Sequence, residues 1–198
     1  MTLFWVSQAL LWLVVIVLAV TVFALARQVG LLHERIAPAG ALSPTRGPQV
    51  GEPVEPERMT DLNGQELVIG GAEPGGRSTL ILFTSPSCPV CRELVPVARR
   101  VAAAERLRLV FASDGGTPES HIDYATEMGL GGYPYLLSRA LGLRFGVSHL
   151  PFAVLIDRDG RLAARGLVNT REHLESLLES MRTGVPNLQA YLAMEQRR

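Results

Sequence analysis

Two cysteines three positions apart give this 198-residue chain its clearest chemical signal. They form the segment Cys88-Pro89-Val90-Cys91, and the sequence contains no other cysteine. A thiolate is the nucleophile in disulfide exchange, so a reactive cysteine needs solvent access and stabilisation of its negative charge. At this spacing both side chains fall on one helix face. Cys91 can then resolve a mixed disulfide that forms at the attacking Cys88, and the pair acts as one reversible two-electron couple.

The residues around the pair predict a strand followed at once by a helix. Residues 79–84 are an apolar run of the kind found in a buried strand of a parallel or mixed sheet. Ser85-Pro86-Ser87 ends this run, and a helix is predicted from Cys88 to about Ala104. The helix amino terminus would place unpaired N–H groups and partial positive charge beside the Cys88 sulfur. This setting favours a redox pair over two inert core cysteines.

A zinc site is another use of closely spaced cysteines, but it needs two further ligands. The candidates would be the four histidines, which show no paired spacing: His33, His121, His149 and His173. We therefore expect no metal and no other cofactor.

The rest of the pattern alternates strands and helices. Strands are predicted at 107–112, 135–137, 152–156 and 162–168, helices at 118–128 and 172–181, and a hairpin at 57–62 and 66–69, while 141–147 is ambiguous. This order predicts an α/β fold, a central mixed sheet flanked by helices on both faces. The helix with the two cysteines would begin at the carboxyl end of a strand, where open α/β sheets place their sites.

An uncharged segment, residues 3–26, is long enough to cross a membrane. As a helix it would span about 36 Å, against about 30 Å for the hydrocarbon core of a bilayer. Ala24-Leu25-Ala26 has the small-x-small form of a cleavage site, so a cleaved signal peptide is the alternative. Because no positive residue precedes the segment and it is longer than a signal core, we expect an uncleaved single-pass anchor. A buried core helix fits least well.

The flanking charges and the cysteine chemistry point to opposite orientations of this anchor. Arg27 and Arg35 follow it, which favours a cytoplasmic carboxyl side. Disulfide chemistry favours the periplasm, because cytosolic thiols are kept reduced. We give the chemistry more weight, since Glu34 partly offsets the two arginines, and expect a bacterial inner-membrane protein with a periplasmic domain.

The overall composition excludes several functional classes. Acidic and basic residues balance at 19 each, which lacks the basic footprint of a nucleic-acid binder. With 47% hydrophobic and 19% charged residues, the chain is not a disordered or solvating segment.

Residues 83–96 resemble the active site of the thioredoxin fold. Pro96 lies five residues after Cys91, where thioredoxins also carry a helix proline, and Leu150-Pro151 before the apolar run 152–156 resembles the cis-proline segment of this fold. The resemblance implies that Pro151 is cis and packs against the disulfide. It also implies that Leu150 presents backbone groups to a bound peptide, so both are substrate-binding candidates.

Within this fold, the hairpin before the core and the insertion at 118–147 are similar to the TlpA and peroxiredoxin-like branch. The anchor, a proline-rich tether and Ser-Pro-Ser-Cys-Pro-Val-Cys resemble the MauD family of methylamine utilisation proteins. This implies a membrane-anchored periplasmic thiol–disulfide oxidoreductase that assists disulfide formation or isomerisation in the small subunit of methylamine dehydrogenase, and so its maturation. The anchor also suggests a membrane redox partner.

Four regions follow from this interpretation: an anchor and flank at 1–35, a Pro/Gly-rich tether at 36–56, a thioredoxin-like domain at 57–184 and a tail at 185–198. Two other functions remain open. One is a TlpA-like thiol reductase for cytochrome c maturation or another extracytoplasmic client, although Ser87 stands where many such proteins have an aromatic residue. The other is a non-catalytic docking module.

Four further residues have both a functional and a plainer interpretation. Arg92 could add positive potential near Cys88, but a solvated helix arginine is the simpler reading. His149 could titrate beside the site or be a polar loop residue, and Asp114 could accept a proton or only form a turn. Thr84 lies four residues before Cys88, not three as in the peroxiredoxin Thr-x-x-Cys, so peroxidase activity is not expected.

Overall fold

The computed structural model describes residues 2–35 and 47–184. The chain forms two compact units, residues 1–43 and 44–198. Most of the predicted tether (36–46) and the whole predicted tail (185–198) lie outside the described residues.

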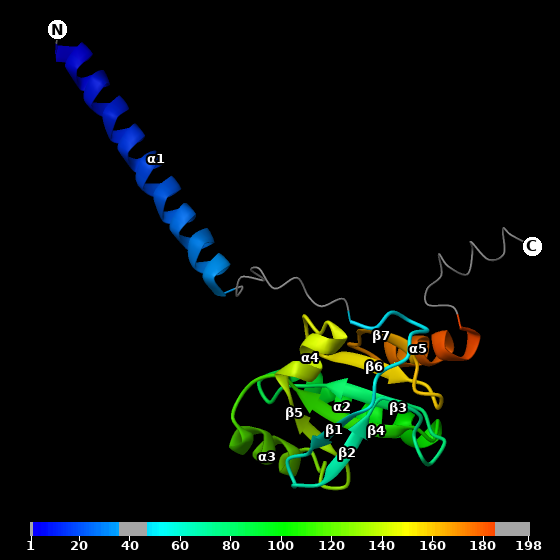
Figure 1. Cartoon of the computed structure of the whole chain (residues 1–198). Helices are drawn as coiled ribbons and strands as arrows, with labels where there is room; N and C mark the ends of the chain where they lie inside the picture. The colour runs from blue at the N-terminus through cyan, green and yellow to red at the C-terminus, as the bar shows by residue number, and fades with distance from the viewer. Residues whose placement is uncertain (1, 36–46, 185–198) are drawn as a thin grey trace, which may run out of the picture. The chain divides into compact units, whose positions relative to one another are not determined.

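The first unit is one long helix, α1 (Thr2–Arg35; Figure 1). Its stretch Phe4–Val22 has a mean hydropathy of 2.3 and none of it is buried. By length and composition α1 is a candidate membrane span, as the uncharged run predicted.

The second unit is built on a five-stranded mixed sheet in the order β5-β4-β3-β6-β7 (Figure 1). Three strands are parallel, namely β3 (Thr79–Phe83), β4 (Arg108–Ser113) and β5 (Tyr135–Leu137). The other two add antiparallel neighbours, β6 (Phe152–Ile156) and β7 (Leu162–Leu167). The parallel pairs are joined by helices α2 (Pro89–Ala104) and α3 (Pro118–Glu127), as parallel connections require.

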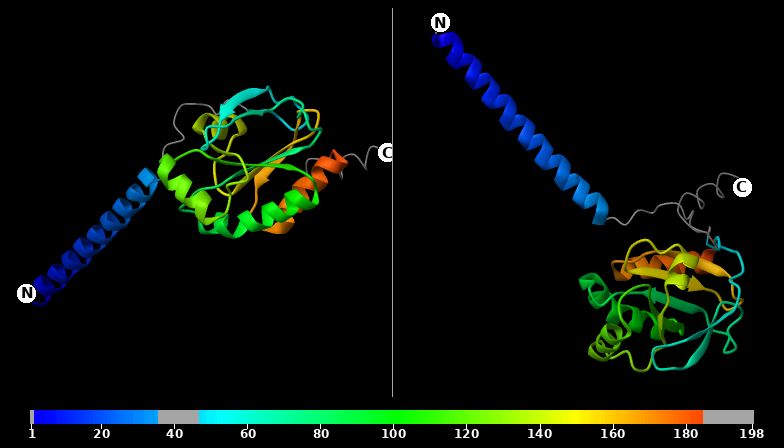
Figure 2. Two further views of the ribbon diagram at one scale, coloured as in Figure 1. Left: turned by 90° about the horizontal axis from the view of Figure 1, so that it is seen from below. Right: turned by 60° about the vertical axis from the view of Figure 1, so that its left-hand side comes forward.

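Both faces of the sheet are covered, because β3 is buried on its two sides. Leu80 and Leu82 pack with α2, α3 and α5 (Arg171–Thr183), and α2 contacts α5 directly (Figure 2). Ile81 and Phe83 point to the opposite side. There they pack with α4 (Arg139–Phe145) and the hairpin of β1 (Glu57–Thr60) and β2 (Glu66–Ile69). The mixed sheet with helices on both faces is therefore confirmed.

Two segments behave differently from what composition alone indicated. The ambiguous segment 141–147 belongs to α4, which Ser138 caps and Gly146 ends in a left-handed conformation. In the proline-rich segment, the Gly51 N–H donates to the Leu162 carbonyl at 2.7 Å, and Val54 is buried. Pairing with β7 thus orders a stretch whose prolines suggested only a tether.

Candidate active site

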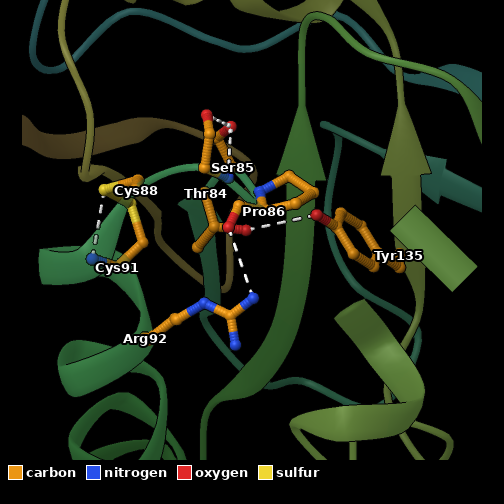
Figure 3. Close-up of a disulfide and its surroundings, with 8 residues drawn as sticks. Thr84, Ser85, Pro86, Cys88, Cys91, Arg92 and Tyr135 are labelled. Atoms are coloured by element: carbon orange, nitrogen blue, oxygen red, sulfur yellow. Dashed lines mark hydrogen bonds between the residues drawn. A yellow bond between two sulfur atoms is a disulfide. The ribbon is translucent and has the colours of Figure 1, made fainter. Parts of the chain in front are cut away.

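The disulfide lies where β3 ends and α2 begins (Figure 3). After Phe83 the chain turns through Ser85-Pro86-Ser87, and the Cys88 N–H donates to the Ser85 carbonyl at 3.1 Å. Cys88 is the N-cap of α2, and its sulfur accepts the Cys91 N–H at 3.1 Å. Pro89 occupies the first turn, where its missing N–H leaves no helix hydrogen bond unmade. The helix start thus directs a donor and its dipole at the Cys88 sulfur.

The two sulfurs differ in accessibility. Cys88 and Cys91 form a disulfide with their Cα atoms 5.3 Å apart. Cys91 is fully buried, whereas Cys88 is half-buried between the exposed residues Ser87 and Pro89. Of the two residues, only Cys88 therefore offers surface that a thiolate from outside could approach.

Leu150 and Pro151 lie at the same edge of the sheet as the turn. Phe152, the first residue of β6, is paired with Phe83, the last residue of β3. The residues just outside this pair are therefore neighbours at one sheet edge, Pro151 on one strand and Thr84 on the other. The Leu150–Pro151 peptide bond is cis, as the resemblance implied. Pro151 is buried and Leu150 half-buried, and among residues 47–184 no backbone hydrogen bond of Leu150 is formed.

Arg92, His149 and Asp114, the further candidates from the sequence, form no hydrogen bond with either cysteine sulfur in the described domain. Arg92 forms an ion pair with Glu127 of α3 and donates to the Pro86 carbonyl at 3.4 Å (Figure 3). The Arg92 side chain therefore holds the backbone of the turn at Pro86, while its charge is paired with that of Glu127. His149 is exposed and hydrogen-bonds to Ser148 at 3.0 Å. Asp114 is exposed just after β4.

A buried polar chain beside the turn was missed by the sequence reasoning. The Thr84 hydroxyl lies 3.4 Å from the Tyr135 hydroxyl, which lies 2.8 Å from Nδ1 of His121. Nε2 of His121 lies 2.6 Å from the Gly115 carbonyl oxygen. Burial raises the pKa of Tyr135 to about 12, although Thr84 partly opposes this shift. Only the placement of Thr84 directly before the turn hinted at such a role.

Within residues 2–35 and 47–184, no group of three or more His, Cys, Asp or Glu side chains could hold a metal ion. Both cysteine sulfurs are engaged with each other, so neither is a free thiolate ligand in this state.

The fold resembles those of several solved thioredoxin-like structures. A putative thioredoxin from Neisseria meningitidis is 22% identical, with a TM-score of 0.53, covering 65% of this chain and 89% of that one. The thioredoxin domain of a thiol-disulfide oxidoreductase from Bacteroides vulgatus is 17% identical, with a TM-score of 0.52, covering 65% and 96%. At these identities the likeness shows the thioredoxin-like fold.

Curated relatives align along nearly the whole chain, although no family model matches it. Methylamine utilization protein MauD of Paracoccus denitrificans is 46% identical over 94% of this chain and 93% of the relative. The MauD protein of Methylobacillus flagellatus is 43% identical over 94% and 90%. Identity of more than 40% over nine-tenths of both chains shows a common family. The chain has a thioredoxin-like fold and belongs to the MauD family of methylamine utilisation proteins.

Proposed function

We propose that this protein exchanges disulfides with a protein client in the periplasm, with Cys88 attacking and Cys91 resolving. The observation that carries the proposal is the asymmetry of the two sulfurs. Cys88 is half-buried and caps α2, whereas Cys91 is fully buried behind it. One reachable sulfur and one protected sulfur are what a two-step exchange requires.

In the oxidising direction, a client thiolate attacks the Cys88 sulfur and breaks the bond to Cys91. Cys91 leaves as a thiolate and takes up a proton. A second client thiol loses its proton and attacks the client sulfur of the mixed disulfide, which releases Cys88 as a thiolate. Cys88 then takes up the second proton, so the client has lost two electrons and two protons and the cysteine pair is a dithiol. The Cys91 N–H, 3.1 Å from the Cys88 sulfur, stabilises the Cys88 thiolate as it leaves.

The reverse sequence reduces a client disulfide, and a single attack by Cys88 followed by rearrangement isomerises one. All three reactions use the same atoms. The direction depends on the relative stability of the dithiol and disulfide forms of the protein and of the client.

The client segment is proposed to lie along Leu150 and Pro151. Leu150 follows the exposed His149 and keeps its backbone groups free of hydrogen bonds within the described domain. An extended peptide carrying a cysteine could therefore pair with Leu150 while its sulfur meets Cys88, because both sites belong to one sheet edge.

The proposed client is the small subunit of methylamine dehydrogenase, whose maturation needs many disulfides. The support is the family, whose members are named for methylamine utilisation. We further propose that residues 3–26 anchor the chain in the inner membrane and that a membrane redox partner recycles the cysteines. Of the predicted tether 36–56, only the part that precedes the pairing of Gly51 with Leu162 is proposed to link the anchor to the domain.

The decisive experiment replaces the chromosomal gene with the Cys88→Ser form in a methylamine-grown strain. We expect the small subunit to disappear while c-type cytochromes persist. The Cys91→Ser form should instead hold the client as a mixed disulfide with Cys88, which non-reducing electrophoresis and mass spectrometry identify.

Other outcomes would replace this proposal. Loss of c-type cytochromes with a normal small subunit would indicate a TlpA-like reductase. A normal small subunit in a strain with both cysteines changed to serine would indicate a docking role. Orientation is tested by labelling reduced cells with a membrane-impermeant maleimide, because the two cysteines are the only ones in the chain. Labelling only after cell lysis would place the domain in the cytoplasm.

A further inference from the structure

The polar chain beside the disulfide has a defined hydrogen-bond direction. A carbonyl oxygen can only accept, so Nε2 of His121 carries the proton that meets Gly115. In the neutral ring Nδ1 then accepts, and the Tyr135 hydroxyl donates to it. Since this uses the only Tyr135 proton, the Thr84 hydroxyl donates to Tyr135. The chain therefore runs from Thr84 through Tyr135 and His121 to the loop after β4.

This chain ends at the residue that begins the active-site turn. Thr84 follows Phe83, the last residue of β3, and its N–H extends the strand pairing by donating to the Ala112 carbonyl at 2.8 Å. The turn to Cys88 is short. Rotation of the backbone at Thr84 would therefore move the Cys88 sulfur relative to Cys91, which is fixed in the buried face of α2.

A second contact holds the middle of the same turn. Arg92 reaches the Pro86 carbonyl at 3.4 Å, and its guanidinium lies 5.3 Å from the centre of the Tyr124 ring. Figure 3 shows Arg92 and Tyr135 approaching the turn from two sides. Tyr124 and His121 both belong to α3, so this helix supports the turn at Thr84 and, through Arg92, at Pro86.

The two buried tyrosines of this cluster differ in one respect. The Tyr135 hydroxyl is bonded on both sides, whereas the Tyr124 hydroxyl has no partner within 3.5 Å in the described protein. Burial raises the pKa of Tyr124, and the nearby Thr84 hydroxyl only partly opposes this shift. The two tyrosine rings pack edge to face with centres 6.4 Å apart, and each side chain is 1% exposed. Removing each hydroxyl therefore gives a matched pair of changes.

We propose that Tyr135, held by His121, is a positioning residue for the Cys88–Cys91 couple. Its hydroxyl fixes Thr84 and keeps the two sulfurs at bonding distance. Loosening this anchor lowers the effective concentration of one thiol at the other, so the disulfide becomes easier to reduce. The inference rests on the proposed redox function and concerns how strongly the protein favours its oxidised form.

The test measures the thiol–disulfide equilibrium of the full-length chain in detergent against glutathione, with alkylation of thiols and mass spectrometry as the readout. Tyr135→Phe should shift the equilibrium about threefold to tenfold towards the dithiol, about 15 to 30 mV for a two-electron couple. Tyr124→Phe keeps the ring and loses only the unbonded hydroxyl, so its equilibrium should stay within about 1.5-fold of the unaltered protein.

Thr84→Val removes the other end of the same hydrogen bond with little change in shape. It should shift the equilibrium in the same direction as Tyr135→Phe, and the double variant should equal Tyr135→Phe alone, because both changes remove one interaction. If Tyr135→Phe does not fold, Thr84→Val alone tests the proposal.

Two results would overturn the inference. One is an equilibrium within about 1.5-fold of the unaltered protein for Tyr135→Phe or, where that variant does not fold, for Thr84→Val. The other is an equal shift in Tyr124→Phe, which would indicate packing alone. Failure of the unaltered protein to cycle between disulfide and dithiol would instead refute the proposed function, so the two failures are distinguishable.

Discussion

The two edges of the central sheet differ in shape and in chemistry. At the edge where β3 ends, the chain presents Cys88, a half-buried residue that forms the disulfide with Cys91. At the opposite edge, a cavity of about 480 Å³ is lined in part by Thr79, Arg108 and Ile156. Arg108 donates there to the Val68 carbonyl at 3.0 Å, and burial lowers its pKa.

We call the edge that carries Cys88 the reactive edge. The cavity lies at the opposite edge, so the largest hollow described above and the disulfide are at different places on the sheet. A cavity encloses a small molecule on several sides, which is how small-ligand sites obtain affinity. A protein client that brings its own cysteine needs one reachable sulfur and an adjoining backbone. The edge with Cys88 and Leu150 offers these, so each edge should respond to substitution in its own way.

The largest effect is expected from Cys88→Ser at the reactive edge. A serine hydroxyl is not ionised near neutral pH, so exchange with a small aromatic disulfide should fall by about 10³-fold or more. The measurement is the initial rate of thiol release by the reduced full-length chain. Ser87→Ala changes the exposed neighbour and should stay within about twofold. Substantial exchange by Cys88→Ser would show that Cys88 is not the attacking residue.

At the opposite edge, Gly70→Ala should lower stability without changing the redox equilibrium. Gly70 has φ +87°, and an added Cβ would lie 2.7 Å from the Val54 carbonyl oxygen and closer still to that of Glu55. The strained backbone and the overlap together should cost about 2 to 3 kcal/mol in the free energy of unfolding by urea.

The matched control for Gly70 is Gly64, in the turn between β1 and β2. It has φ +79° but no atom within 4 Å of an added Cβ. Gly64→Ala should therefore cost only about 1 kcal/mol, from the backbone conformation alone. Equal losses for the two glycines would show that the close approach at the cavity edge does not matter.

A smaller effect is expected on the free energy of unfolding at alkaline pH, where Tyr135 at the reactive edge contributes. Burial raises its folded-state pKa to about 12, while an unfolded tyrosine has a pKa of about 10. Below pH 10 both states keep the proton, and the contribution of Tyr135 to stability is full. As pH rises from 10 to 12 the unfolded state releases its proton first, so this stability is lost.

The measurement for Tyr135 is the free energy of urea unfolding at pH 9, 10, 11 and 12 for the unaltered protein and for Tyr135→Phe. The unaltered protein should lose about 1 to 3 kcal/mol more between pH 10 and 12. Parallel curves would contradict the raised pKa.

The smallest effect is expected from Arg108→Gln, within the cavity. Glutamine can still donate to a carbonyl, so the free energy of unfolding should change by only about 0.5 kcal/mol. The glutathione equilibrium of the disulfide should stay within about 1.5-fold. A shift as large as that proposed for Tyr135→Phe would show that the two sheet edges are coupled.

Local patterns were sufficient for most of the fold. The apolar run at 79–84 became β3, and the hairpin predicted at 57–62 and 66–69 formed as β1 and β2. Proline density did not reveal the pairing of Gly51 with Leu162, because that bond joins segments more than a hundred residues apart. The seven-residue helix α4 is too short for its periodicity to be decisive, although its end signals Ser138 and Gly146 were present.

By itself, the sequence determined that two cysteines form the candidate redox site and that this site lies between a strand and the start of a helix. Two cysteines at helical spacing directly after an apolar strand require a turn and a helix start beside a sulfur, and these are local consequences of residue type. Only the tertiary structure decided what holds that turn. Thr84 and Tyr135 are 51 residues apart and meet because β3, β4 and β5 pair in one register. Hydrogen bonds between distant buried groups depend on how the whole core packs, so no local pattern reveals them.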